Sequence, residues 1–236
     1  MNVVDDLDAM PPAMAFHTFL LMLIAVTLGA LAAAVALPAW LPGLAASLLG
    51  SAPKAYWYLS RSSAFVAYGL LWFSMALGLL ITNKLARVWP GGPTAFDLHQ
   101  YASLLGFAFA LFHGLILMGD KFIAYTLAQV LTPFASANFR PLWVGLGQIS
   151  FYLFGIVALS FYVRGFVGNR FWRLIHYLSF AVFLLALAHG LASGTESASD
   201  WARYFYWISG GSLLLLTVYR ILVSVKIKRQ PPAPTA

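Results

Sequence analysis

The sequence predicts an all-α membrane protein built as a bundle of six transmembrane helices. Of its 236 residues, 61% are hydrophobic and only 9% are charged, whereas soluble domains carry about 25% charged residues because their surface faces water. The apolar residues occur in six runs, each long enough for the roughly 20 residues that a helix needs to cross the hydrocarbon core. One compact membrane domain fits this length.

The predicted spans are separated by apolar connections or by short polar links. The first span is expected to end at Pro38, and the connection Pro38–Lys54 to lie at the membrane interface. A second connection, Asp120–Arg140, contains a short interfacial helix at Ile123–Leu131, and the basic link Arg164–Arg170 joins the fourth and fifth spans. The six spans are Met14–Leu37, Tyr56–Asn83, Asp97–Gly119, Pro141–Val163, Trp172–Ala192 and Trp201–Val225.

The chain divides into a cytoplasmic N-terminal segment (1–13), the membrane domain (14–225) and a basic, Pro-rich cytoplasmic tail (226–236). The acidic start lacks the positive region of a signal peptide, so the first span is expected to be retained. Six spans place both termini on one side, together with nine of the 14 Lys and Arg residues. The positive-inside rule therefore predicts a multi-pass protein of the inner or plasma membrane with both termini in the cytoplasm.

Composition also excludes several kinds of function. The net charge of +7 does not indicate nucleic-acid binding, because the basic residues cluster at the ends of apolar runs, where they can contact anionic lipid. The chain has no cysteine, so disulfides, iron–sulfur clusters, thiol catalysis and c-type haem attachment are excluded.

Four of the five histidines form a pattern on two predicted spans. His99 and His113 lie 14 residues apart on the third span, and His176 and His189 lie 13 residues apart on the fifth. The two histidines of one span are therefore separated by roughly 20 Å along the helix. Both spans run in the same direction, so His99 and His176 share one depth, and His113 and His189 share another. A polar residue satisfied by packing is the alternative for any one of them. Two imidazoles at each of two depths, however, suit the axial ligation of two stacked b-type haems.

The helical angles leave the local geometry open. Fourteen residues return to within about 40° of the same helix face, whereas the 13 residues from His176 to His189 leave about 140°. The fifth helix must therefore bend, bulge or use different rotamers, or the two haems are rotated relative to each other. Gly106, Gly114 and Gly190 leave room for flat macrocycle edges, or serve ordinary helix packing.

Three stretches of the sequence carry a resemblance to a known family. They are RSSAFVAYGLLWFSMALGLL from Arg61, DLHQYASLLGFAFALFHG from Asp97 and FWRLIHYLSFAVFLLALAHG from Phe171. They resemble the ferric reductase-like transmembrane domain family, which includes ferric-chelate reductases and the membrane half of NADPH oxidases, and the resemblance covers roughly residues 56–225. It implies that His99 and His176 ligate the inner haem, and that His113 and His189 ligate the outer haem, as depth alone suggests.

Two arginines are candidates for the haem propionates, since buried carboxylates need charge-assisted partners. Arg173 lies one turn before His176 and is predicted to serve the inner haem. Arg61 lies inside the second span near the depth of His113 and is predicted to serve the outer one; the family is similar in placing arginine at both positions. The alternatives are a topology-setting charge for Arg173 and snorkelling to the surface for Arg61. His17 has no partner histidine and is expected to be a packing or interfacial residue.

The chain departs from the flavocytochrome members of the family after its sixth span. Only eleven residues remain and no G-x-G-x-x-G follows a strand, so no FAD or NAD domain is expected on this chain. We expect transmembrane electron transfer from a separate cytoplasmic flavoprotein, a free flavin or a quinol. The acceptor would be ferric chelate, dioxygen or an extracytoplasmic partner protein.

Two other functions stay open at this point. One is a haem-bearing accessory subunit that turns over nothing itself, and the other is a transporter with incidental histidines. The family also resembles the haem subunit that feeds periplasmic methionine sulfoxide reductase, which supports a partner-dependent role. The two complete histidine pairs favour the bis-haem reductase type over that subunit.

Overall fold

The computed structural model describes residues 10–50, 54–137 and 139–229. Within this part of the chain every regular element is a helix, and six helices are long and apolar enough to cross a membrane. The predicted all-α fold with six spans is confirmed, and the chain is a multi-pass membrane protein. The spans are Phe16–Trp40, Ala55–Thr82, Gly92–Gly119, Pro141–Val167, Asn169–Ser193 and Asp200–Val225.

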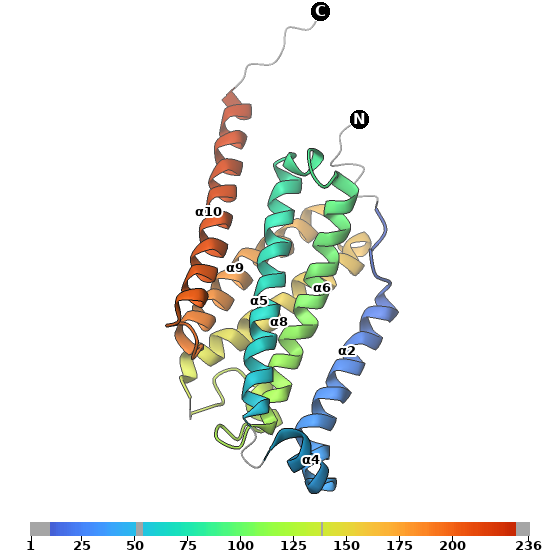
Figure 1. Ribbon diagram of the computed structural model, residues 1–236. Coiled ribbons are helices and arrows are strands. Elements are labelled where there is room, and N and C mark those ends of the chain that lie inside the picture. Colours follow the sequence, from blue (N-terminus) through green and yellow to red (C-terminus); the bar gives the residue numbers. More distant parts are fainter. Residues whose placement is uncertain (1–9, 51–53, 138, 230–236) are drawn as a thin grey trace, which may run out of the picture.

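Two helical hairpins form the centre of the bundle (Figure 1). Helix α5 (Ala55–Thr82) packs along the antiparallel helix α6 (Gly92–Ile116). Helix α8 (Pro141–Val167) packs along α9 (Asn169–Ser193), and this second hairpin runs obliquely behind the first. The oblique crossing means that α6 and α9 approach each other without packing side by side.

The remaining two spans cover the sides of the hairpins. Helix α2 (Phe16–Leu31) lies on α6, and α10 (Asp200–Arg229) lies on α5. The start of α2 and the end of α10 lie at the same end of the molecule (Figure 1), as six spans require. Large apolar side chains on the outer faces, such as Leu28 and Leu215, are exposed, which suits a hydrocarbon surrounding rather than water.

The first span continues beyond the predicted end at Pro38. The segment Ala32–Ala36 is a π-helical turn, and α3 (Leu37–Trp40) follows it without a break. The N–H of Leu37 donates to the carbonyl of Ala32, one residue further back than in an α-helix. A proline ring normally clashes with the preceding helical turn and lacks the N–H that this turn needs. The wider π turn before Pro38 allows the helix to reach Trp40.

Both long connections contain a short helix. The predicted interfacial connection after the first span holds α4 (Pro42–Leu49). In the second connection the predicted helix Ile123–Leu131 is too long, because α7 covers only Leu127–Leu131. Thr126 and Gln129 form a reciprocal capping box, and such a box fixes the start of a helix at its N-cap residue.

The predicted link Arg164–Arg170 is much shorter in the structure. Helix α8 continues to Val167 and α9 begins at Asn169, so only Gly168 separates them. Its φ of 78° lies in the left-handed region, which glycine adopts without the steric cost of a side chain. Helix α10 also extends past the predicted end of the sixth span to Arg229, and the rest of the predicted tail lies outside the described residues.

Candidate functional site

The structure brings the four histidines together in the two predicted pairs. The ring centroids of His99 and His176 are 5.9 Å apart, and the planes of the two rings are inclined by 65°. The ring centroids of His113 and His189 are 6.3 Å apart, with an inclination of 70°. We call the first pair the inner pair and the second the outer pair.

The separation within each pair fits a metal between two imidazoles. A metal–nitrogen bond to histidine is about 2.0–2.1 Å long in zinc sites, and two trans imidazoles at such distances have ring centroids roughly 6 Å apart. Within the described residues no group of three or more His, Asp or Glu side chains could hold a metal ion. The donor set therefore suits a metal whose other ligands come from a macrocycle, as in a six-coordinate haem.

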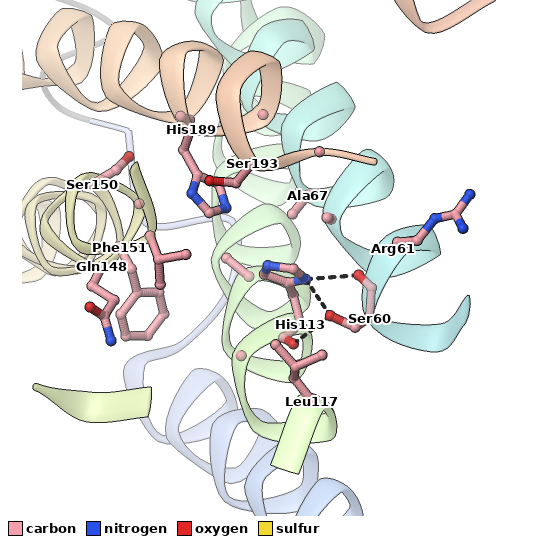
Figure 2. A pocket seen from close by; sticks show the side chains of 18 of the residues that line it. Ser60, Arg61, Ala67, His113, Leu117, Gln148, Ser150, Phe151, His189 and Ser193 are labelled. Atoms are coloured by element: carbon pink, nitrogen blue, oxygen red, sulfur yellow. Dashed lines mark hydrogen bonds between the residues drawn. The ribbon is translucent and has the colours of Figure 1, made fainter. Parts of the chain in front are cut away.

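Hydrogen bonds to α5 orient both histidines of α6. Nδ1 of His99 lies 2.8 Å from the carbonyl oxygen of Ser74, and Nδ1 of His113 lies 2.8 Å from that of Ser60. A carbonyl oxygen only accepts, so each Nδ1 donates and each Nε2 keeps its lone pair for a ligand. The serine Oγ atoms also contact the two Nδ1 atoms at 2.9 Å (Figure 2 shows the outer one).

The spacing of these serines matches the spacing of the histidines. Ser60 and Ser74 are 14 residues apart on α5, as His99 and His113 are on the antiparallel α6. Each serine hydroxyl also donates to the backbone carbonyl of its histidine at 3.1 Å. The same contact is therefore built twice along one hairpin. Such hydrogen bonds to the non-ligating nitrogen fix the tautomer and orientation of a metal-binding histidine.

His189 reaches the neighbouring helix α8 in a similar way. Its Nδ1 donates to the carbonyl oxygen of Trp143 at 2.9 Å. A Cβ atom on Gly147 would lie 2.6 Å from that Nδ1, so the absence of a side chain at this position makes room for the imidazole. Gly78 plays the equivalent part for His99, since a Cβ there would lie 3.3 Å from Cε1 of the ring.

A small residue lies four positions after each accepting carbonyl. Ala64 follows Ser60, Gly78 follows Ser74 and Gly147 follows Trp143 by one helical turn. Side chains at i and i+4 lie above each other on one helix face. A small residue at i+4 therefore exposes the carbonyl to an imidazole from a neighbouring helix. Sequence reasoning missed this pattern, although the repeated Ser-x-x-x-small motif on the second span could have revealed it.

His176 differs from the other three histidines. Within the described part of the chain, its ring nitrogens make no hydrogen bond. The indole of Trp172 lies beside it instead, with ring centroids 5.2 Å apart and planes inclined by 31°. The inner pair thus has one histidine anchored by hydrogen bonds and one held by aromatic packing.

A largely apolar cavity of about 260 Å³ lies at the outer pair. His113 and His189 line it from α6 and α9 and project toward the same space, with Phe151 of α8 at its side (Figure 2). Gln148 closes one wall, because its Nε2 donates to the carbonyls of Gln129 and Val130 at 2.7 and 2.8 Å and so holds α7 in place.

The three glycines that the sequence singled out have different surroundings. Gly114 and Gly190 line the outer cavity. A Cβ on Gly190 would also lie 2.8 Å from the hydroxyl of Tyr206, and one on Gly106 would approach Leu70 and Phe154 at 3.3 and 3.5 Å. Gly106 and Gly190 therefore permit close helix packing, the alternative role that the sequence left open.

The two predicted arginines have different surroundings. Arg61 lines the outer cavity, but its guanidinium points away from His113 (Figure 2) and its Nη2 forms an ion pair with Glu196. Arg173 is exposed, and its Nε donates to the carbonyl of Asn169 at 3.3 Å. The ion pair between Arg61 and Glu196 was not predicted, because the sequence does not show that the end of α9 returns to the start of α5.

The 13-residue spacing on α9 is accommodated without a bulge, since the helix is α-helical from Asn169 to Ser193. His189 turns toward α8, whereas His176 lies beside Trp172 on its own helix. The two imidazoles thus have different neighbours, but each lies beside a histidine of α6.

Comparison with known families agrees with these observations. The sequence model of the family described as "Ferric reductase like transmembrane component" matches residues 63–187, more than half of the chain. The chain belongs to this family. No curated protein and no solved structure matches it.

Membership of the ferric reductase-like family implies electron transfer across a membrane in general terms. The matched region contains His99, His113 and His176, together with Ser74, Gly78 and Gly147. His189 and Arg61 lie two residues outside it, at opposite ends. The case for His189 as a ligand therefore rests on the geometry of the outer pair and not on the family match.

Proposed function

We propose that this family member transfers electrons across the membrane through two haem b groups. His99 and His176 would hold the inner haem, and His113 and His189 the outer haem. The two pairs of imidazoles, with ring centroids 5.9 and 6.3 Å apart, carry the proposal, because each pair could hold one haem iron between its two rings. Bound haem would supply a one-electron couple of its iron at each depth.

The side chains around the histidines define what the protein contributes. Ser74, Ser60 and the carbonyl of Trp143 hold three Nδ1 atoms, so that three Nε2 atoms are presented in fixed directions. Fixed ligands lower the reorganisation that accompanies a change of charge, and apolar walls exclude water from the site. Arg173 and Arg61 remain our candidates for the propionates of the inner and outer haems.

We further propose cytoplasmic termini in the inner or plasma membrane, with a separate donor on that side. The donor would be a flavoprotein, a free reduced flavin or a quinol. The outer pair then faces the connections Asp120–Arg140 and Glu196–Asp200, which are available to contact an acceptor. The acceptor would be ferric chelate, dioxygen or a partner oxidoreductase.

The first test is the absorption spectrum and the haem content of the purified protein, expressed with added haem. We expect two non-covalent haems per chain and a low-spin, six-coordinate spectrum. A colourless protein would refute the proposal and would support the transporter alternative. One haem per chain would refute the two-haem arrangement.

A second test separates electron transfer from an accessory role. The protein is reconstituted in liposomes of determined orientation, with reduced flavin on the cytoplasmic face and an impermeant ferric chelate on the other. We expect reduction of the chelate, and its loss in the variants His99→Ala and His189→Ala. If the haems become reduced but the chelate does not, even with candidate partner proteins, the chain is an accessory subunit.

A further inference from the structure

Three buried polar atoms at the outer cavity have no hydrogen-bond partner within the described part of the chain. They are Nε of Arg61, the hydroxyl of Tyr125 and the hydroxyl of Ser193. All three residues line the cavity that contains His113 and His189. Tyr125 and Ser193 are only 7% and 9% exposed, so the two hydroxyls are withdrawn from bulk solvent.

The three atoms come from separate parts of the sequence. Arg61 belongs to α5, Tyr125 to the connection between α6 and α7, and Ser193 to the last turn of α9. Buried polar groups in native proteins are nearly always paired, because an unpaired one loses its hydrogen bonds to water without replacement. Three such groups around one cavity indicate a ligand that completes them.

The chemistry of these groups defines the ligand. An arginine Nε–H and two hydroxyls all donate hydrogen bonds, so the ligand must present acceptors. The rest of the cavity is mainly apolar, and the two imidazoles face it. A flat apolar ligand with carboxylates at its edge satisfies both requirements.

We propose that Tyr125 and Ser193, together with Arg61, bind the carboxylates of the macrocycle held by His113 and His189. This inference rests on the proposed function, and it adds Tyr125 and Ser193, which the sequence did not suggest, to Arg61. Ser193 follows His189 by four residues, so both lie on one face of α9, and Figure 2 shows them side by side.

The surroundings of Tyr125 and Arg61 support the same assignment. A tight turn fixes the approach to Tyr125, since Oδ1 of Asp120 accepts from the N–H groups of Phe122 and Ile123 at 2.9 Å. The positive charge of Arg61 is shared with Glu196 through its Nη2 atom. A carboxylate at this site therefore depends on uncharged donors more than it would beside a free arginine.

The test uses the purified protein with its haems and the variants Tyr125→Phe and Ser193→Ala, singly and combined. Loss of each haem to an excess of a haem-scavenging apoprotein is followed by absorption, and the outer haem is identified by its absence in His113→Ala. We expect outer-haem loss to accelerate on the order of tenfold in each single variant, as for one lost charge-assisted hydrogen bond, and to accelerate further in the double variant. The inner haem should be unaffected.

The variant Ser136→Ala is the matched control, because its hydroxyl is also buried and unpartnered but does not line the cavity. A decisive second measurement supplies haem dimethyl ester, which lacks ionised carboxylates. We expect the ester to leave the outer site of the wild type faster than haem does, and we expect this difference to be much smaller in the double variant, where only Arg61 remains to bind the carboxylates.

The outcomes separate the two proposals. If the ester weakens retention equally in wild type and double variant, or if Ser136→Ala has the same effect as Ser193→Ala, these hydroxyls do not bind the carboxylates. The proposed function then still stands. If the wild-type protein holds no outer haem at all, the proposed function fails first.

Discussion

His189 occupies the space that a side chain at position 147 would need. A Cβ atom on Gly147 would lie 2.6 Å from Nδ1 and 2.7 Å from Cγ of the imidazole. The ring enters this space to reach the carbonyl of Trp143, so one glycine of α8 determines where a histidine of α9 points.

The first prediction is that Gly147→Ala displaces His189. Because real Cβ contacts are not this short, the imidazole must move and lose its bond to Trp143. A lost hydrogen bond costs about 0.5–1.5 kcal/mol, and overpacking adds about 1–3 kcal/mol. We expect the outer haem to bind weakly or to become high-spin, as measured by absorption and electron paramagnetic resonance.

Gly165→Ala on the same helix is the control for that variant. A Cβ on Gly165 would meet nothing within 4 Å. In a helix interior, alanine is favoured over glycine by roughly 0.8–1 kcal/mol, so this variant should keep both haems. Equal behaviour of the two variants would contradict the steric explanation.

The second prediction concerns the two serines of α5. Ser60→Ala removes the oxygen that lies 2.9 Å from Nδ1 of His113, which makes this imidazole a weaker electron donor to a bound ferric iron. We expect the midpoint potential of the outer haem to rise by about 20–60 mV, since one hydrogen bond is worth about 0.5–1.5 kcal/mol and about 59 mV is tenfold for one electron.

Ser74→Ala should raise the potential of the inner haem in the same way, by its contact with His99. Redox titration followed by absorption measures both shifts. Ser160→Ala is the control, because its buried hydroxyl donates only to the carbonyl of Val157 on its own helix α8. A shift of both haems in Ser60→Ala, or an equal shift in Ser160→Ala, would argue against a local effect on the ligand.

The spans and the histidine pairs could be predicted from sequence because both depend on position along helices. The length of an apolar run shows whether a helix can cross the membrane, and the helix rise per residue gives the depth of each residue along it. The ends of the spans were less predictable where the backbone departs from a regular α-helix. The first span passes Pro38 because a π turn precedes it, and nothing in the alanine-rich segment Ala32–Ala36 indicates that turn.

The contacts across helices could not be read from one sequence. The position of Trp143 beside His189, and the ion pair from Arg61 to Glu196, depend on how α8 and α9 cross α5 and α6. Helix crossing follows from many side chains at once. By contrast, the 14-residue spacing of Ser60 and Ser74 was present in the sequence. It becomes informative only when compared with His99 and His113 on the neighbouring antiparallel span.

The third prediction assigns each histidine to one haem. His113→Ala or His189→Ala should remove the outer haem preferentially, and His99→Ala or His176→Ala the inner one. The assignment is tested by the haem content per chain and by the midpoint potential of the haem that remains in each variant. Loss of the same haem in His99→Ala and His113→Ala would contradict the pairing.

His17→Ala is the control, since this histidine is exposed on α2, away from both pairs. We expect two haems and unchanged potentials in this variant.

The inner haem should be the more sensitive of the two to changes near His176, because Trp172 rather than a hydrogen bond holds that ring. Trp172→Leu should therefore broaden or shift the signal of the inner haem alone.

The fourth prediction is that both termini are cytoplasmic. The first span begins and the sixth ends at one end of the bundle (Figure 1), and nine of the 14 Lys and Arg residues are expected there. Translocation of basic residues is disfavoured during insertion, so this end should remain in the cytoplasm. A tag placed after Ala236 should resist protease added to intact cells or spheroplasts and become sensitive once the membrane is permeabilised.

A reporter in the α9–α10 connection, for example between Ser197 and Ser199, should behave in the opposite way. Cleavage of the C-terminal tag in intact cells, with protection of the connection, would show an inverted protein. Inversion would leave both histidine pairs intact, since their geometry does not depend on orientation. It would place His113 and His189 on the cytoplasmic side, however, and electrons from a cytoplasmic donor would then have to enter next to Arg61 and Glu196 instead of next to Arg173.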